Sequence, residues 1–281
     1  MPTESGQLQH VQANGLRFAY FEQGEGPLVL LLHGFPDTAH TWDEVRPALA
    51  AEGYRVVSPF MRGYHPTEAP ARDEFDSDAL GRDALALIEA LGETQAIVVG
   101  HDWGASAAYS AAGLGPEKVR ALVTMAVPHP AGLRPSPRLL WQFRHFFSLR
   151  RKGAADKARA NDFAIIDELV QRWSPAWQVP PGETEAVKRC FRQPGALEAA
   201  LGYYRCLRPR PPAGQRRPVT MPAAAFAGTE DNISPELYER TRPRYRNHFE
   251  VVRVRGGHFM HREHPEGFIR ELVRVTKELT A

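Results

Sequence analysis

The chain has 281 residues, which suffices for one large domain with a substantial core or for a core that carries an insertion. Its 43% hydrophobic and 24% charged residues are ordinary for a soluble globular protein, and the net charge of +2 points to no nucleic-acid or membrane partner. The two cysteines have no metal-ligand or redox spacing, and no apolar run resembles a signal peptide or a membrane span, so we expect a cytoplasmic protein, either a monomer or a homodimer.

Strands and helices alternate along the first 127 residues. The predicted strands are 8–11, 16–21, 27–32, 54–59, 95–99 and 119–127. The predicted helices are 41–52, 76–91 and 105–112. The first two strands form a hairpin, because Asn14-Gly15 between them favours a tight turn. The alternation predicts an α/β fold with a mostly parallel sheet that helices cover on both faces.

From residue 128 the composition changes, and proline and arginine become more frequent. The segments with helical character are 139–149, 155–173, 183–192 and 197–207, followed by a proline-rich linker at 209–218. Residues 131–218 hold 17 Lys and Arg against 7 Asp and Glu, whereas the rest of the chain holds 18 against 26. We interpret this imbalance as a solvated, arginine-rich surface that meets an acidic core.

The sheet pattern resumes with strands at 221–227 and 249–254 and with helices that begin at Pro235 and Pro265. Residues 1–128 and 219–281 are therefore predicted to form one core. Residues 129–218 are predicted to form a helical cap over the carboxyl edge of its sheet. The alternative is a peripheral helical domain with no part in the site.

Residues 100–104, Gly-His-Asp-Trp-Gly, lie between a predicted strand and a predicted helix. A tight turn there strains its central residue and admits only small residues two places to either side, which Gly100 and Gly104 provide. The side chain of Asp102 is then directed out of the sheet edge. A carboxylate needs no base to act as a nucleophile, and attack at a saturated carbon leaves an alkyl ester on the enzyme. The alternative is that Asp102 only caps the helix that follows.

Such an ester needs a base that activates water, and His258 in a glycine-rich loop is the best candidate. Asp231, just after another strand, is expected to orient the imidazole, with the adjacent Glu230 as second choice. Nucleophile, acid and histidine then follow one another in a chain order that one hydrolase architecture uses. His261 and His264 compete with His258, but they lie within or beside the start of the last helix.

The strand at 27–32 ends in His33-Gly34-Phe35-Pro36. Because a glycine lets the chain turn sharply, the backbone amides of Phe35 and Trp103 are expected to form an oxyanion hole. His33 directly follows a buried strand and is expected to brace the loop through hydrogen bonds.

These motifs resemble the α/β-hydrolase fold family and, within it, the cap-bearing epoxide hydrolases. The resemblance covers nearly the whole chain and rests on residues 33–36, 100–104, 127–130, 228–231 and 257–258. It implies that Asp102 opens an epoxide and that water activated by His258 hydrolyses the ester to a vicinal diol. The reactants are then a small apolar molecule and water, and no cofactor or metal is expected.

The resemblance also implies that two cap tyrosines donate protons to the emerging alkoxide. The second tyrosine falls on Tyr204 in the segment 199–205, and Tyr203 points elsewhere; ordinary aromatic packing is the alternative for both. The segment 140–147 occupies the place of the first tyrosine, but its register puts Phe143 there. Either Tyr204 acts alone or His145 supplies the missing donor. Other residues expected around the substrate are His33, Trp141, Phe143 and Tyr203.

A haloalkane dehalogenase with the same triad is the first alternative, because such enzymes also have Trp after the nucleophilic Asp. They need a second halide donor, usually an Asn where this chain has Phe35, which offers only its backbone N–H. Haloacid dehalogenases are disfavoured because Trp103 and Ser106 stand where they carry arginines, and esterases because the turn lacks their Ser. The third reading is a non-catalytic, hydrolase-like protein that holds a ligand under its cap.

Overall fold

The computed structural model describes residues 6–133 and 144–281. The strands are β1 (Gln9–Ala13), β2 (Leu16–Gln23), β3 (Leu28–Leu32), β4 (Arg55–Pro59), β5 (Ala96–His101), β6 (Val119–Met125), β7 (Ala223–Gly228) and β8 (Phe249–Val254). The core helices are α1 (Val45–Ala51), α2 (Ser77–Ala90), α3 (Trp103–Leu114), α10 (Pro235–Glu239), α11 (Met260–Glu263) and α12 (Pro265–Glu278). Between β6 and β7 lie α5 (Arg144–Leu149), α6 (Ala154–Trp173), α7 (Glu185–Phe191), α8 (Ala196–Arg205) and α9 (Ala213–Arg216). Short 3₁₀ turns are η1 (Ala39–Trp42), η2 (Pro116–Lys118), η3 (Pro130–Gly132) and η4 (Arg242–Arg244).

The strands form one sheet in the order β1-β2-β4-β3-β5-β6-β7-β8. The pairs β1 with β2 and β2 with β4 are antiparallel, and the other neighbours are parallel, so the predicted α/β architecture is confirmed. The predicted hairpin is present too, since Asn14 and Gly15 both have positive φ, as its tight turn requires. The chain leaves β3 toward one side of the sheet and β5 toward the other, and in such sheets this reversal creates a crevice at the carboxyl ends.

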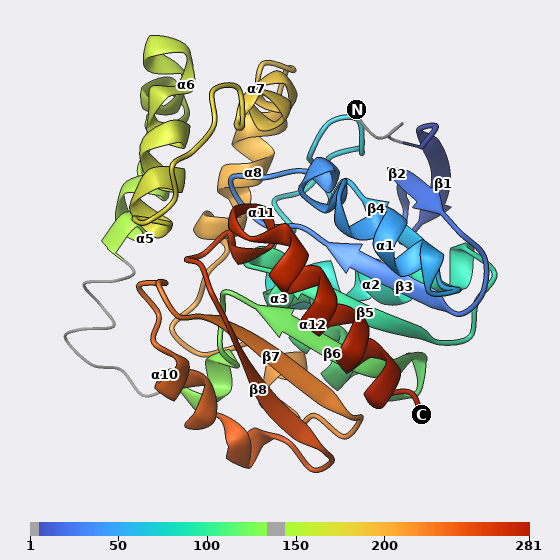
Figure 1. The fold of residues 1–281 in the computed structure, drawn as a ribbon. Helices are drawn as coiled ribbons and strands as arrows, with labels where there is room; N and C mark the ends of the chain where they lie inside the picture. Colours follow the sequence, from blue (N-terminus) through green and yellow to red (C-terminus); the bar gives the residue numbers. More distant parts are fainter. Residues whose placement is uncertain (1–5, 134–143) are drawn as a thin grey trace.

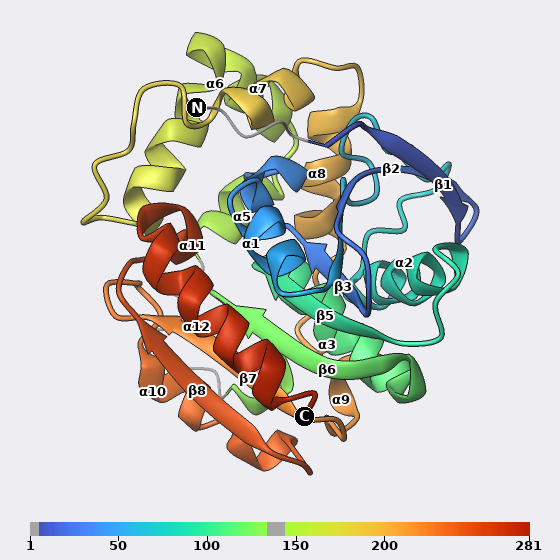
Figure 2. The same ribbon diagram turned by 45° about the vertical axis from the view of Figure 1, so that its right-hand side comes forward.

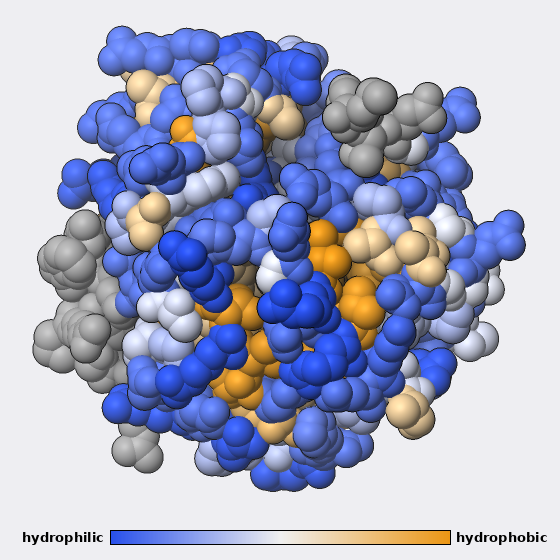
Figure 3. Space-filling model, viewed as in Figure 1, coloured by the Kyte–Doolittle hydropathy of each residue, from blue (hydrophilic) through white to orange (hydrophobic). Residues whose placement is uncertain are grey.

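Both faces of the sheet are covered. Along β3, residues 28, 30 and 32 belong to one hydrophobic core, and residues 29 and 31 belong to the other. The views in Figures 1 and 2 place α1 and α12 on one face and α2 and α3 on the opposite face. On the face that carries α1 and α12, the surface is mainly hydrophilic, with apolar patches between charged groups (Figure 3). None of the described helices combines the length and the apolar composition that crossing a membrane requires.

The helices α5 to α8 gather at one end of the sheet (Figure 1). The ring of Tyr204 in α8 lies 5.3 Å from the ring of Phe35, which follows β3, and 5.2 Å from that of Trp103, which follows β5. Since both residues lie within three residues of the carboxyl ends of parallel strands, α8 lies over these ends of the central strands. This position brings the helices between β6 and β7 to the crevice.

Three predicted elements differ in detail. The helix expected at 41–52 is divided into η1 and α1, because Pro47 has no N–H to bond the preceding turn and is tolerated only in a first turn. Residues 160–163 interrupt α6 with non-helical backbone angles. The proline-rich linker contains the short helix α9, whose Gly214 amide donates to both carboxylate oxygens of Asp78 in α2, at 3.1 Å each.

Candidate active site

Asp102 occupies the turn between β5 and α3. Its φ of 52° and ψ of −113° lie in a region that side-chain-bearing residues rarely adopt. A Cβ at Gly100 would lie 2.3 Å from the carbonyl oxygen of Gly104, and one at Gly104 would lie 2.1 Å from that of Leu32. Both glycines are therefore required for this packing. The Asp102 side chain makes no capping hydrogen bond to α3 and keeps 15% exposure, which argues against a purely capping role.

His258 lies between two carboxylates. Its Nε2 is 3.6 Å from Oδ2 of Asp102, and its Nδ1 is 3.8 Å from Oδ2 of Asp231. Both are ion-pair distances, longer than hydrogen bonds. The other oxygen of Asp231 accepts a hydrogen bond from the Ile233 amide at 3.0 Å, which fixes the carboxylate. The three predicted triad residues thus lie together, whereas Glu230 pairs with Arg255 at 3.5 Å.

The carboxylates set the charge of the imidazole. Burial lowers the pKa of His258, but Asp102 and Asp231 raise this pKa by more, to about 9. Burial likewise raises the pKa of Asp102, but His258 and the Phe35 amide lower it by more, to below its ordinary value. At neutral pH the site therefore holds an imidazolium beside an ionised Asp102.

One of the two predicted oxyanion-hole amides, that of Phe35, contacts Asp102. The Phe35 N–H donates to Oδ1 of Asp102 at 2.9 Å. Trp103 is the first residue of α3, where backbone N–H groups have no partner within a helix. The Trp103 amide is therefore free of an intrahelical partner, and its part in an oxyanion hole stays a prediction.

Tyr204 and Tyr203 differ in their contacts. Burial and the Asp102 charge raise the pKa of Tyr204 well above its ordinary value, while a hydrogen bond from the Trp103 side chain lowers it. Tyr204 therefore stays protonated and lies close enough to Asp102 to sense its charge. The Tyr203 hydroxyl instead donates to the Arg62 carbonyl at 2.8 Å, so it points elsewhere, as expected, and braces the loop after β4.

The remaining predicted substrate contacts fare differently. His33 is fully buried, its Nδ1 donates to the Gly34 carbonyl at 3.0 Å, and its Nε2 accepts from the Met61 amide at 2.9 Å. With both ring nitrogens bonded to backbone groups, His33 braces its loop, as expected, and a contact between His33 and the substrate stays a prediction. Trp141, Phe143 and the side chain of His145 lie outside the described residues.

Sequence reasoning missed two features of the site. The hydroxyl of Tyr64 is buried without a hydrogen-bond partner among the described residues, and burial, with smaller contributions from Tyr203, Tyr204 and Asp102, raises the pKa of Tyr64 well above its ordinary value. The other feature is the backbone amide of His258, which donates to the Trp173 carbonyl at the end of α6 at 3.1 Å. Both depend on contacts between segments far apart in the sequence, so local sequence patterns do not reveal them.

A further charged contact joins the core to the segment before α7. Arg262, which lies in α11, pairs with Asp37 at 2.9 Å and with Glu183 at 2.6 Å. The same guanidinium donates to the Glu183 carbonyl at 2.7 Å. This three-residue contact, the Arg262 clamp, ties the α6–α7 connection to the core four residues after His258.

The competing histidines are not in the triad. The ring of His261 is buried, and its Nε2 lies 2.6 Å from the Thr41 hydroxyl. His264 precedes α12 and is only partly buried. Each of the two belongs to a separate group of potential metal ligands: Asp37, His101 and His261 in one, and Glu230, Glu263 and His264 in the other.

Comparison with known proteins supports this architecture. The alpha/beta hydrolase fold family matches residues 27–265. The chain is 31% identical to the AB hydrolase superfamily protein YfhM of Bacillus subtilis, over 92% of this chain and 93% of that protein. It is 30% identical to epoxide hydrolase 4 of Mus musculus, over 91% of this chain and 75% of that protein. The crystal structure of an epoxide hydrolase from Vigna radiata superposes with a TM-score of 0.83 at 27% identity, over 98% of this chain and 99% of that one. The chain therefore belongs to the alpha/beta hydrolase fold family, within which it resembles proteins named epoxide hydrolases.

Proposed function

We propose that the protein hydrolyses epoxides to vicinal diols through a covalent ester on Asp102. The observation that carries the proposal is the environment of this carboxylate, which has His258 at 3.6 Å, the Phe35 amide on one oxygen and the protonated Tyr204 nearby. A strained nucleophile, a base and a proton donor then meet at one sheet edge. The names of the relatives support the same reaction.

In the first step an oxygen of Asp102 attacks a ring carbon of the epoxide. The new C–O bond forms as the ring C–O bond breaks, and its electron pair moves to the former ring oxygen. That alkoxide takes the proton of Tyr204. Burial raises the pKa of the phenol, so Tyr204 holds its proton until a strongly basic alkoxide appears, and the leaving oxygen departs as a hydroxyl group.

Ester formation changes the charge that His258 experiences. The alkylated Asp102 is neutral, so one of the two groups that raise the pKa of His258 is lost. The imidazolium then gives up its proton, which returns through water to the Tyr204 phenolate. Neutral His258, held by Asp231, removes a proton from water, and the resulting hydroxide attacks the ester carbonyl. The amides of Phe35 and Trp103 stabilise the oxyanion, and its collapse releases the diol and restores the Asp102 carboxylate.

Residues 129–218 act as a cap in this proposal. α8 brings Tyr204 over the carboxyl ends of β3 and β5, and the hydrogen bond from His258 to the Trp173 carbonyl joins the end of α6 to the catalytic loop. Tyr64 is our candidate for a second proton donor. Its buried hydroxyl has no described hydrogen-bond partner, and burial, with a smaller contribution from the charge of Asp102, raises its pKa and keeps it protonated.

The proposal is tested by trapping the ester. His258→Gln is incubated with aryl, alkyl and terminal epoxides and, in parallel, with haloalkanes, and the intact mass is measured. We expect a stoichiometric adduct on Asp102 with an epoxide, while diol release falls by on the order of 1,000-fold or more. Asp102→Asn is the blank.

An adduct with haloalkanes alone, together with halide release by the wild type, contradicts the proposal in favour of a dehalogenase. The contacts work against that outcome, because the Trp103 side chain already donates to Tyr204 and Phe35 offers a halide only its amide. No adduct with any substrate, together with reversible binding, favours a ligand-binding protein.

A further inference from the structure

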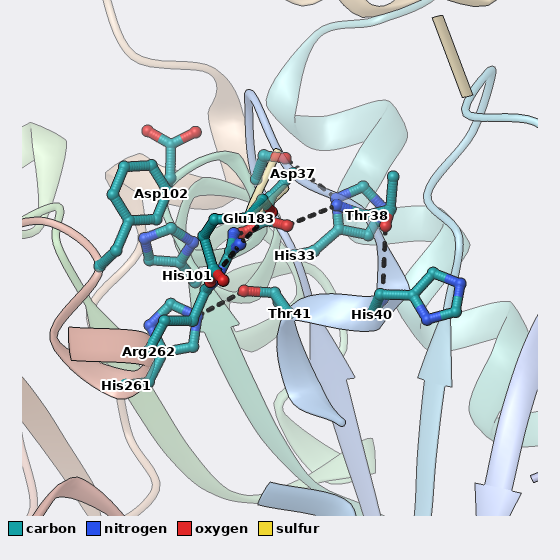
Figure 4. Close-up of polar contacts among 12 residues, drawn as sticks. His33, Asp37, Thr38, His40, Thr41, His101, Asp102, Glu183, His261 and Arg262 are labelled. Carbon is teal, nitrogen blue, oxygen red and sulfur yellow. Dashed lines mark hydrogen bonds and ion pairs between the residues drawn. The ribbon is translucent and has the colours of Figure 1, made fainter. Parts of the chain in front are cut away.

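Three buried side chains from different elements converge behind the catalytic residues. Asp37 lies in the loop after β3, His101 is the last residue of β5, and His261 lies in α11. One ligand atom of each lies within 4.8 Å of those of the other two. Figure 4 shows this group beside Arg262 and Thr41. All three are over nine-tenths buried, at 4% exposure for Asp37, 0% for His101 and 1% for His261.

One nitrogen of each ring has a hydrogen-bond partner, and the other nitrogen has none among the described residues. Nε2 of His101 lies 3.0 Å from the His258 carbonyl, which can only accept, so this nitrogen carries the proton. Nε2 of His261 lies 2.6 Å from the Thr41 hydroxyl, which accepts equally well. With Thr41 as the acceptor, both Nδ1 atoms carry lone pairs, and in either tautomer of His261 neither Nδ1 has a hydrogen-bond partner among the described residues.

The Asp37 carboxylate accepts from the Thr38 amide at 2.9 Å and from Arg262 at 2.9 Å, and its oxygens keep further lone pairs. The Nδ1 atoms of His101 and His261 have no partner among the described residues, and a buried polar atom without a partner is costly. A cation beside the carboxylate satisfies both ring nitrogens.

We propose that Asp37, His101 and His261 form a binding site for a divalent transition metal ion, with Zn²⁺ as the best match. Two imidazole nitrogens and one carboxylate oxygen suit Zn²⁺, and a water molecule completes four-coordination. The partners on Nε2 act as outer-shell groups that orient the rings, as is usual for metal-binding histidines.

The surroundings of the site allow the ion to enter. Asp37 and Glu183 share the single positive charge of Arg262, so the clamp carries a net charge of −1 that offsets the incoming ion. Asp37, His261 and Arg262 also line a groove of about 420 Å³ between η1 and the segment 177–189. Because Asp37 and His261 line this groove, we expect the ion to enter from it.

A bound ion would stabilise the fold, because it would link the loop after β3, the end of β5 and α11. Nε2 of His101 already holds the backbone of His258, so an ion on Nδ1 of His101 stiffens the segment that carries the catalytic imidazole. Binding only to the native state raises thermal stability in proportion to the logarithm of the free ion concentration.

The test uses the full-length protein after dialysis against a chelator. Zn²⁺ is titrated calorimetrically, and Co²⁺ is titrated with detection of its visible ligand-field absorption. We expect one equivalent of each ion to bind, a tetrahedral Co²⁺ spectrum and a Zn²⁺-dependent rise in melting temperature. His261→Gln is expected to weaken Zn²⁺ binding by more than about tenfold.

His264→Gln is the matched control, because it makes the same substitution in the neighbouring ligand group and is expected to leave binding unchanged. Ion binding by the wild type is measured as well, so the proposal can be tested even if a variant folds poorly. A wild type that binds neither ion overturns the proposal and leaves a bridging water as the occupant. So does binding that His264→Gln abolishes and His261→Gln spares.

Discussion

Nε2 of His258 and Oδ2 of Asp102 lie 3.6 Å apart, so the base and the nucleophile of the proposed reaction form an ion pair before any substrate is present. The pair makes each partner less reactive than it would be alone. It also means that loss of the Asp102 charge on ester formation lowers the pKa of His258. The imidazole can then act as the base in the second step, the hydrolysis of the ester.

The first prediction concerns this coupling. Asp102→Asn removes one of the two carboxylates that raise the pKa of His258, so we expect this pKa to fall clearly below about 9. Titration of the imidazole by nitrogen-15 NMR measures it. Asp231→Asn should lower the pKa as well. Glu230→Gln should leave it unchanged, because Glu230 pairs with Arg255, and an effect of Glu230 equal to that of Asp231 would contradict the assignment.

The pH dependence of ester hydrolysis follows from the same charges. A raised pKa means that His258 is protonated at neutral pH in the free protein and loses its proton as pH rises through about 9. In the ester the Asp102 charge is absent, so this transition moves to lower pH. Single-turnover diol release should therefore rise with pH and level off below about 9. A rate that falls as pH rises through this range would rule out His258 as the base.

Three tyrosines make a matched series. Tyr204→Phe should slow ring opening by about 100-fold or more, because the alkoxide loses its proton donor. Tyr64→Phe should cause a smaller loss, as a second donor. Tyr203→Phe should retain activity but lose about 1 kcal/mol of stability, because the Arg62 carbonyl loses its hydrogen bond. Rates of single-turnover alkylation and urea denaturation separate these effects, and full activity in Tyr204→Phe would refute its role.

The Arg262 clamp is the subject of the fourth prediction. Arg262→Met leaves Asp37, which is 4% exposed, without its cationic partner, so we expect a loss of about 3 kcal/mol in unfolding free energy. Urea denaturation measures it. Arg270→Met is the matched control, since the Arg270 side chain is 75% exposed and pairs with Glu271 at 3.7 Å, and its effect should stay within about 0.5 kcal/mol. Equal losses in both variants would mean that burial of the pair is unimportant.

Local sequence patterns predict most of the fold. Gly100 and Gly104 identify the turn at Asp102, and Asn14-Gly15 identifies the hairpin, because each feature depends on backbone geometry within a few residues. By contrast, residues 160–163 interrupt a helix whose apolar spacing gives no warning. The order of Asp102, Asp231 and His258 in the chain predicts their roles. The distances between their side chains depend on how distant segments pack, which the order does not reveal.

Contacts between distant segments are what the patterns do not reveal. The grouping of Asp37, His101 and His261, and the pairing of Arg262 with Glu183, arise only when segments far apart in the sequence come together. His33 illustrates the converse. Its position after a buried strand predicted a bracing role, and both of its ring nitrogens are occupied by backbone groups.

Asp102 is the single residue that separates β5 from α3. Because β5 ends one residue before it and α3 begins one residue after it, the backbone position of Asp102 is fixed. The position of its carboxyl group then depends on the single methylene group of the side chain. Asp102→Glu adds a methylene group and moves the carboxylate oxygens beyond the amide of Phe35. The backbone around Gly100 and Gly104 is too closely packed to shift and compensate. An acid of the right charge but the wrong length is therefore no substitute at this position.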